Sequence, residues 1–345
     1  MFKILFASSS RSKTFTYYRM TQPIKHLHKD MQAMGVGLYF NDVVRDTVPA
    51  ADVVVFNNLM HPDFYSTIEQ ISKNSDIIWQ LDDNFFEISE SNPVKGEVTE
   101  LHLAMLNACL DLASLIVCTT STLAKAVGRP AKTTVLPNLI DMDDYPAYFP
   151  KRGKRCLWAG SNTHLEDLDL ISHLPQLMPE HQFVFMGQLP STVSRMTLNY
   201  NSLEFKPVGA NVGYIKHVSF EDYNSVFTSA AAGSGIGLLP LADTEFNRSK
   251  SNLKYLEMAA CGLPVVASAV GPYKTNTGYF VAKDNSDWEE KILAATPEMG
   301  EAGYKYVASH MSWQSDSQKE KWLKALSYII AKPVSFDIEW GNDAI

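Results

Sequence analysis

Three charged residues in the last third of the chain have a spacing that suits a bound anion. Lys250, Lys254 and Glu257 lie at positions i, i+4 and i+7 of a predicted helix over 250–261, so they share one face of it. Lysine near a helix start opposes the helix dipole by about 0.3–1 kcal/mol. A diphosphate at that end would remove this cost, because free backbone N–H groups and lysines together bind anions. A solvated Lys254–Glu257 ion pair is the alternative interpretation.

The elements that must position these residues follow from short apolar segments that alternate with helical patterns. Six such segments precede residue 138 and six follow residue 154. They are 3–7, 36–40, 52–56, 76–81, 114–118, 133–137, 155–159, 182–187, 202–208, 234–239, 264–268 and 278–282. Helical patterns between them include 98–113, 164–174, 219–231 and 250–261. Unbroken apolar strands that alternate with helices are typical of parallel sheets covered on both faces.

The predicted fold class is therefore α/β, with two doubly wound, Rossmann-like domains that face a cleft. We expect an amino-terminal domain over 1–145 and a carboxyl-terminal domain over 150–311, joined by a polar, proline-containing linker. We expect the helix over 312–330 to pack back toward the amino-terminal domain and 331–345 to be a tail. A chain of 345 residues, 46% of them hydrophobic, is long enough to fill two such cores.

Polar residues that directly follow predicted strands are the next candidates for a site, because doubly wound sheets bind ligands outside the carboxyl ends of their strands. Asp82 and Asp83 follow the strand 76–81. Gly160 and Ser161 follow the strand 155–159, and His164 comes shortly after. For the aspartates the alternative is a helix or turn cap, and for the second loop it is a well-capped helix.

The stretch SNLKYLEMAACGLPVVAS, residues 251–268, resembles the donor-binding segment of GT-B glycosyltransferases, above all the retaining, sucrose-synthase-like group 1 or family 4 type. The resemblance implies the GT-B fold and implies that Glu257 holds the ribose of a sugar nucleotide. The first glutamate of that family's Glu-x7-Glu pattern is replaced here by Ser249. Donor contacts in its place are expected from nearby polar side chains, which are Asn247, Ser249, Ser251 and Asn252, and from the loop of Gly160, Ser161 and His164.

Basic and aromatic residues are interleaved near the amino terminus, and the first 29 residues contain no acidic residue. Arg11, Lys13, Tyr18 and Arg19 are the predicted acceptor contacts on the opposite wall of the cleft. Such a pattern also suits nucleic acid, although a net charge of −8 gives the whole chain no general affinity for it. A solvated loop and helix start is the alternative.

Composition and missing motifs exclude several other classes. The four cysteines are widely spaced in apolar runs, which favours reduced thiols and a cytoplasmic location. No apolar run reaches about 18 residues, so we expect no membrane span. The Asp141-Met142-Asp143 sequence resembles a metal-binding D-x-D but falls in the linker, and we expect no metal and no cofactor besides the donor. Dinucleotide-binding, P-loop, esterase and zinc-protease motifs are missing.

These features together predict a hexosyl- or pentosyltransferase that moves a sugar from a nucleotide-diphosphate sugar, with UDP-sugar favoured, to an acceptor hydroxyl. Lys250, Lys254, Asp82 and Asp83 are the predicted catalytic residues. Retention of configuration is implied by the resemblance, and the lysines make a metal unnecessary. The acceptor is either a glycan or a hydroxymethylated base of phage-type DNA. A GT-B-fold sugar-nucleotide epimerase and a non-catalytic nucleotide-sugar-binding protein remain as alternatives.

Overall fold

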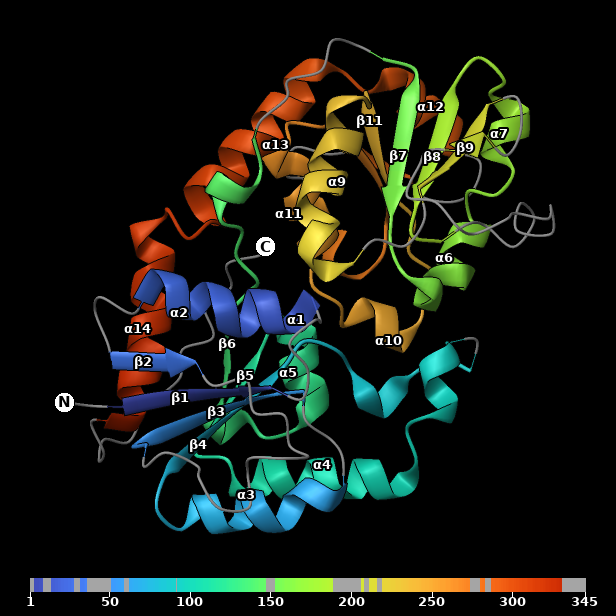
Figure 1. The fold of residues 1–345 in the computed structure, drawn as a ribbon. Helices are drawn as coiled ribbons and strands as arrows, with labels where there is room; N and C mark the ends of the chain where they lie inside the picture. The colour runs from blue at the N-terminus through green and yellow to red at the C-terminus, as the bar shows by residue number, and fades with distance from the viewer. Residues whose placement is uncertain are drawn as a thin grey trace.

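Two parallel sheets, each covered by helices, make up the structure (Figure 1). The computed structural model describes residues 3–8, 14–27, 32–35, 51–58, 62–90, 92–146, 153–188, 206–207, 211–215, 219–273, 280–282 and 287–330. Between these sheets the chain crosses twice, once before β7 and once after α13 (Pro297–His310). The fold class predicted from the sequence, α/β with two parallel sheets, is confirmed.

The first sheet has six strands, and every pairing in it is parallel. Their spatial order is β2 (Gln32–Gly35), β1 (Lys3–Ser8), β3 (Val53–Asn57), β4 (Asp76–Leu81), β5 (Leu115–Cys118) and β6 (Thr133–Val135). Alternate residues of one strand enter opposite cores, as the pleat requires. Leu5 and Ala7 of β1 pack on the side of α3 (Tyr65–Ser72), α4 (Glu100–Leu112) and α5 (Ser121–Val127), whereas Ile4 and Phe6 pack on the other side.

The second sheet has seven strands, and all but one of its pairings are parallel. The order is β13 (Phe280–Ala282), β12 (Val265–Ser268), β11 (Ile236–Leu239), β7 (Arg155–Ala159), β8 (Gln182–Met186), β10 (Val212–Ile215) and β9 (Lys206–Pro207), with β9 antiparallel to β10. Its remaining helices are α6 (Leu165–Asp169), α7 (Leu174–Leu177), α9 (Phe220–Ala232), α10 (Glu245–Arg248), α11 (Leu253–Ala260) and α12 (Asp287–Ala294).

The last helix, α14 (Asp316–Ile330), returns to the first sheet, as Figure 1 shows. Trp313, Trp322 and Leu326 are buried in the same core as Ile4 and Phe6. The two chain crossings lie side by side there, because the Trp313 N–H donates to the Ile140 carbonyl at 2.9 Å and the Ile140 N–H donates to the Met311 carbonyl at 3.0 Å. The carboxyl-terminal helix therefore packs against the core of the first sheet.

Several element boundaries differ from those expected. The predicted strand 36–40 lies outside the described residues, and of the predicted strand 202–208 only 206–207 are described, which form β9. Strand β10 was not expected, because its central Gly213 weakens the apolar signal. The predicted helix 164–174 is split into α6 and α7, and the predicted helix 250–261 begins only at Leu253.

The four cysteines lie in the cores as free thiols. Cys109, Cys118, Cys156 and Cys261 are all free and buried. Within the described residues no helix has the length and apolar character needed to cross a membrane.

Candidate active site between the two sheets

The point where the strand order reverses locates the candidate site in each sheet. In the first sheet the reversal lies between β1 and β3, and in the second it lies between β7 and β11. Crevices at such points, outside the carboxyl ends of the strands, are where doubly wound sheets bind ligands. Asn58 directly follows β3, Gly160 follows β7 and Pro240 follows β11. One cavity is lined by Asn58 and another by Pro240, and the two cavities share lining residues.

The smaller cavity, of about 150 Å³, lies mainly on the second sheet. Its wall is formed by residues that follow β7 and β11 and by the segment before α11. These are Trp158, His164, Leu239, Pro240, Leu241, Lys250, Ser251, Leu253, Lys254 and Tyr273, with Asp82, Asp83 and Asn138 from the first domain. Two lysines and a helix start in one small cavity make a site for a doubly charged anion.

Lys254 is the most perturbed cation of this cavity. Its Nζ lies 5.0 Å from the centroid of the Trp158 ring, a cation–π distance. Burial, with a contribution from the neighbouring Lys250, lowers the pKa of Lys254 to about 7. Gly160 makes room for this arrangement, because a Cβ there would lie 2.5 Å from Lys254 Nζ and 2.6 Å from the Trp158 ring. An anion in the cavity would restore the full charge of Lys254.

His164 lines the same cavity as a neutral imidazole. Burial, together with Lys254 and Lys250, lowers its pKa to about 3. Its Nδ1 lies 2.6 Å from Asp167 Oδ2. The other oxygen of Asp167 accepts from the Ala242 N–H at 2.7 Å and from Asn247 Nδ2 at 2.9 Å. Asn247 Nδ2 also donates to the Ala242 carbonyl at 3.0 Å, so this amide holds the loop after β11, and its contact with the donor stays a prediction.

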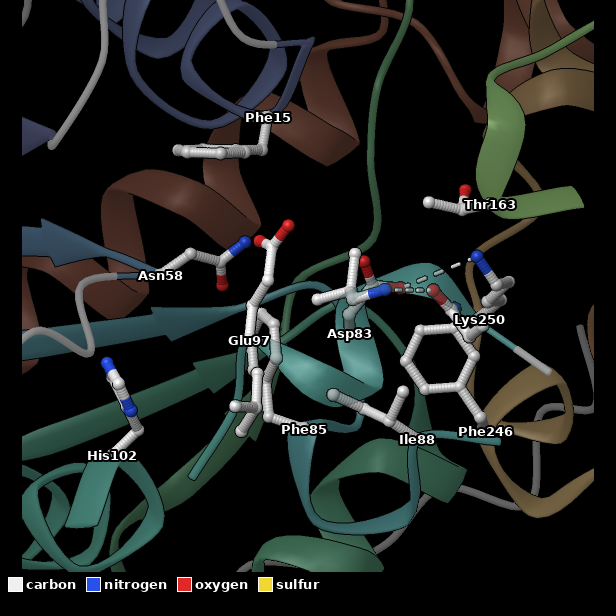
Figure 2. A pocket seen from close by; sticks show the side chains of 13 residues that line it. Phe15, Asn58, Asp83, Phe85, Ile88, Glu97, His102, Thr163, Phe246 and Lys250 are labelled. Atoms are coloured by element: carbon white, nitrogen blue, oxygen red, sulfur yellow. Dashed lines mark hydrogen bonds and ion pairs between the residues drawn. The ribbon is translucent and has the colours of Figure 1, made fainter. Parts of the chain in front are cut away.

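The larger cavity, of about 380 Å³, lies mainly on the first domain (Figure 2). Aromatic and polar side chains alternate on its wall, which consists of Phe15, Asn58, Asp83, Phe85, Ile88, Asn92, Val94, Glu97, Val98, His102, Thr163, Phe246 and Lys250. Asp83 and Lys250 line both cavities, and Lys250 Nζ lies 3.8 Å from Asp83 Oδ1. The two cavities therefore meet at this pair.

Asp82 and Asp83 differ in their surroundings although they are adjacent. Burial, together with the Asp83 carboxylate, raises the pKa of Asp82 to about 6. Asn58 Nδ2 donates a hydrogen bond to Asp82 Oδ1. Asn58 itself has a φ of 48°, a left-handed conformation that is uncommon for a residue other than glycine. Asp83 is left to face Lys250 and both cavities.

The segment just before α11 is held by the first domain. Asn84 Nδ2 donates to Ser249 Oγ at 3.2 Å, and Thr120 Oγ1 donates to the Ser249 carbonyl at 2.8 Å. Asn138 Nδ2 donates to Ser251 Oγ at 3.0 Å. Asn252 occupies the N-cap of α11 without a side-chain cap. Of the four polar residues expected to contact the donor, only Ser251 lines the smaller cavity, and Ser249 instead joins the two domains.

Lys250 belongs to this segment and not to the helix. Since α11 begins at Leu253, the expected helical stripe of Lys250, Lys254 and Glu257 is not formed as a continuous face. The short helix α10 ends at Arg248, and the turn that follows is fixed by the bonds to Ser249. Lys250 and Lys254 nevertheless line the same cavity, so the predicted anion site keeps both lysines.

Glu257 is enclosed by tyrosines from three different elements. Its Oε1 accepts from the Tyr18 hydroxyl at 2.9 Å and from the Tyr145 hydroxyl at 3.3 Å, and its Oε2 accepts from Tyr223 at 3.4 Å. Only 3% of Glu257 is exposed. Burial raises the pKa of this carboxyl, against the opposing effect of Tyr18 and Lys254. Contact with a ribose stays a prediction, and it requires Tyr18 to withdraw.

The predicted acceptor contacts on the amino-terminal segment are not open to a ligand where they are described. Tyr18 is buried against Glu257, and Arg19 is 0% exposed. Arg19 donates to Gln80 Oε1 and to the Leu136 carbonyl, each at 2.8 Å, and it lies 4.7 Å from the centroid of the Trp322 ring. The spacing of apolar residues in a sequence does not predict that an arginine between them is buried. Arg11 and Lys13 lie outside the described residues.

The D-x-D sequence of the linker has a structural role. Asp141 is fully buried and accepts from Gln314 Nε2 at 2.7 Å, and it lies 2.8 Å from His26 Nε2. Although burial opposes it, hydrogen bonding by His26, Lys25 and Gln314 lowers the pKa of Asp141 far below its ordinary value. Among the residues that the structure describes, no group of three or more histidines, cysteines or acidic residues is arranged to hold a metal ion.

Several residues of the larger cavity were not identified from the sequence. Asn58 could have been found, because it directly follows β3 just as Asp82 follows β4. Phe15, Phe85 and Glu97 carry no local signal, since only the tertiary fold brings these distant positions to one wall.

One known protein family matches part of the chain. Residues 168–319 match the model of the glycosyl transferase-like family. A search of the curated proteins finds no significant match. The matched segment contains β11 and α11, and it contributes to the wall of the smaller cavity Leu239, Pro240, Leu241, Lys250, Ser251, Leu253, Lys254 and Tyr273.

Solved structures with the same architecture include HepE from Anabaena in complex with UDP and glucose. It has a TM-score of 0.64 and 14% identity, over 95% of this chain and 100% of that one. An α-glucosyltransferase in complex with UDP and a 13-mer DNA containing an HMU base has a TM-score of 0.63 and 12% identity, over 96% and 99% of the chains. A glycosyltransferase involved in avilamycin A biosynthesis has a TM-score of 0.58 and 11% identity, over 96% and 98%. The fold is the GT-B fold, and the resemblance predicted from the sequence is confirmed.

Proposed function

We propose that this chain, which combines the GT-B fold with a glycosyl transferase-like domain over 168–319, moves a sugar from a UDP-sugar to an acceptor hydroxyl. The observation that carries the proposal is the meeting of two cavities, one on each domain, at Asp83 and Lys250. A transferase needs such a junction, because donor and acceptor must be held in contact. HepE and the α-glucosyltransferase were both solved with UDP, which supports UDP as the leaving group.

In the proposed reaction the smaller cavity holds the diphosphate of the donor. The bond between the sugar C1 and the diphosphate oxygen breaks, and a bond forms between C1 and the acceptor oxygen. The proton of the acceptor hydroxyl passes to the departing diphosphate. Lys250 and Lys254 counter the charge that develops on this group, and Asp83 orients hydroxyls at the junction. Retention of configuration is part of the proposal and is supported by the resemblance of residues 251–268 to retaining enzymes.

The proposal gives the lysines the role that a metal ion has in other glycosyltransferases. We therefore expect activity to persist in EDTA. Loss of activity in EDTA with recovery on addition of Mg²⁺ or Mn²⁺ would contradict this part of the proposal.

The decisive experiment measures donor binding first and turnover second. UDP-, GDP-, ADP- and TDP-sugars are compared by thermal shift, and UDP release is then followed with and without acceptors. Lys250→Met should reduce kcat by about 10²–10³-fold, the usual effect of removing one group that stabilises a developing anion. The matched control is Lys305→Met, an exposed lysine of α13 that pairs with Glu301 and should leave kcat unchanged. Equal rates in both variants would remove Lys250 from the reaction.

The same experiment separates the two alternatives. A sugar-nucleotide epimerase is an alternative because it needs a pair of carboxylates as acid and base, and Asp82 and Asp83 lie next to each other at the cavity. An epimerase would change the donor sugar without an acceptor, whereas a non-catalytic binding protein would bind the donor without turnover. The proposed acceptor is either a glycan or a hydroxymethylated base of DNA, and the free buried cysteines keep a cytoplasmic location as our expectation.

A further inference from the structure

The proposed function leaves two classes of acceptor open, a glycan and a hydroxymethylated base of DNA. The residues that line the larger cavity favour one of them. We infer that this cavity takes a non-anionic saccharide as the acceptor. That the saccharide is an acceptor rests on the proposed function. The chemical class of the ligand is argued from the cavity alone. Its volume of about 380 Å³ falls within the range of small-molecule sites.

Aromatic rings supply the apolar part of the wall. Phe15 comes from α1 (Thr14–Thr16), Phe85 from the 3-10 helix Phe85–Glu87, and Phe246 from α10. Figure 2 shows Phe15 and Phe85 on opposite sides of the cavity. Ligand sites combine apolar and aromatic walls with a few placed polar groups, and a sugar ring offers both an apolar face and a hydroxyl edge. A flipped nucleobase would also stack on such rings, so charge must decide between them.

Two polar groups of the wall offer unused hydrogen-bond acceptors. Glu97 is exposed, and its carboxylate has no partner among the described side chains. Asn58 Oδ1 is buried and likewise has no hydrogen-bond partner among the described residues, because the amide uses its nitrogen for Asp82. In Figure 2 Asn58 and Glu97 converge on the space below Phe15. Hydroxyl donors of a sugar complement these acceptors, and hydrogen bonds to a carboxylate are the stronger kind.

An anionic acceptor finds little to bind on this wall. Lys250 is the one lysine or arginine among the described lining residues, and it already faces Asp83 at 3.8 Å. A DNA strand needs lysine and arginine contacts along its phosphates, and a phosphate or carboxylate on a sugar would approach Glu97 and Asp83 directly. Of the basic residues predicted as acceptor contacts, Arg19 is buried elsewhere, and Arg11 and Lys13 lie outside the described residues. The charge of the cavity therefore selects against phosphorylated, sulfated and nucleic-acid acceptors.

The test compares acceptors that differ only in charge. UDP release is measured with neutral disaccharides, with the same disaccharides carrying a 6-phosphate or a uronate, and with DNA that contains hydroxymethylated bases. We expect kcat/KM for the neutral member of each pair to exceed that of its anionic partner by about fivefold to tenfold. Glu97→Gln should narrow this difference and Glu97→Lys should reverse it, while UDP-sugar binding stays unchanged. The matched control is Glu87→Gln, an exposed glutamate of the Phe85–Glu87 helix that does not line the cavity.

A second variant tests the aromatic wall. Phe85→Ala should lower acceptor kcat/KM about tenfold while donor binding is kept, and Phe85→Tyr should restore it. Preference for DNA or for phosphorylated sugars in the wild type would overturn the inference, and so would equal losses in the Glu97 and Glu87 variants. If no UDP-sugar binds, the proposed function fails. Saturation-transfer NMR of the same saccharide pairs without donor still decides the ligand class of the cavity.

Discussion

The lysines of the smaller cavity have different neighbours, although they line one space. Lys250 faces the Asp83 carboxylate and lies 4.7 Å from the centroid of the Phe246 ring. Lys254 has the face of Trp158 and the space left by Gly160 beside its amine, and the effect of burial on its pKa outweighs the attraction of Asp167 and Glu257. A buried amine without a carboxylate beside it loses its proton more easily. Lys254 is therefore the residue whose charge depends most on whether a diphosphate is bound.

We predict that UDP binding takes up a proton at pH 8. With a pKa of about 7, Lys254 is mostly neutral at that pH in the free protein, and a bound diphosphate favours its charged form. Titration calorimetry in buffers of different ionisation enthalpy should show uptake of nearly one proton at pH 8 and much less at pH 6. Lys254→Met should abolish the uptake, and Lys305→Met should keep it. A wild-type binding heat that is the same in all buffers at pH 8 would contradict the assignment.

Asp82 leads to a prediction about stability and pH. Its pKa is raised from 3.8 to about 6, so the folded state favours the protonated form. A raised pKa contributes stability below the unfolded value, and this contribution is lost as the pH rises through 6. The free energy of unfolding of Asp82→Asn should therefore exceed that of the wild type by up to about 3 kcal/mol at pH 8 and equal it near pH 4. Thermal unfolding at the two pH values measures this difference. The exposed Asp169→Asn variant is the control, and a gap for Asp82→Asn that does not change with pH would refute the prediction.

At the scale of elements, the segment between α10 and α11 decides how the donor cavity is built. The sequence indicates one helix from residue 250, yet the chain turns through Ser249 and Asn252 before α11 begins. Local propensity cannot foresee this turn, because the side chains of Asn84 and Thr120 that hold Ser249 come from the other domain. The apolar strands were predictable for the opposite reason: each is a local, continuous apolar run, and β4 and β7 have the predicted bounds.

The π-helical turn Tyr17–Thr21 shows the same limit for a charged residue. Arg19 sits inside the first domain, between Gln80 of β4, the carbonyls after β6 and the ring of Trp322 on α14. A basic residue in a sequence predicts a solvated face far more often than a buried donor. The guanidinium here joins three elements that are distant along the chain, and the sequence alone does not show that they meet.

We predict that Arg19 matters for stability and not for acceptor affinity. Arg19→Met keeps much of the apolar volume but leaves Gln80 Oε1 and the Leu136 carbonyl without their donor, at about 1–3 kcal/mol for each buried group. Urea unfolding should show a loss of about 2–5 kcal/mol. Arg129→Met, which breaks a partly exposed pair with Asp111, should cost less than about 1.5 kcal/mol. A fully stable Arg19→Met with impaired acceptor use would reinstate the basic acceptor role.

At the scale of the whole molecule, the described residues join the two domains at several places, and three of these bear on closure of the cleft. The crossings near Ile140 and Trp313 pair with each other and form the covalent connection. Ser249 and Ser251 are bound by Asn84, Thr120 and Asn138 across the cleft. The third place is Glu257, which Tyr18 of the first domain covers. The structure is therefore closed in the sense that the two domains contact each other across the cleft, with Glu257 covered by Tyr18, and the contact of Glu257 with a ribose stays a prediction.

Opening of the cleft gives the final prediction. Asn84→Ala with Thr120→Val removes two hydrogen bonds between the domains and, within the first domain, the cap bond from the Leu123 N–H to Thr120 Oγ1. Loss of the two bonds between the domains should shift the balance toward an open form by about 1–3 kcal/mol. Small-angle scattering of the protein without donor should show a larger radius of gyration, with the far-ultraviolet circular dichroism unchanged. The matched control, Asn107→Ala with Thr228→Val, removes the same side-chain groups inside single domains and should leave the radius unchanged. An unchanged radius in the first variant would show that the hinge and Tyr18 alone hold the closed form. An increase would mean that the contacts at Ser249 close the cleft, so that Glu257 can be reached only after they part.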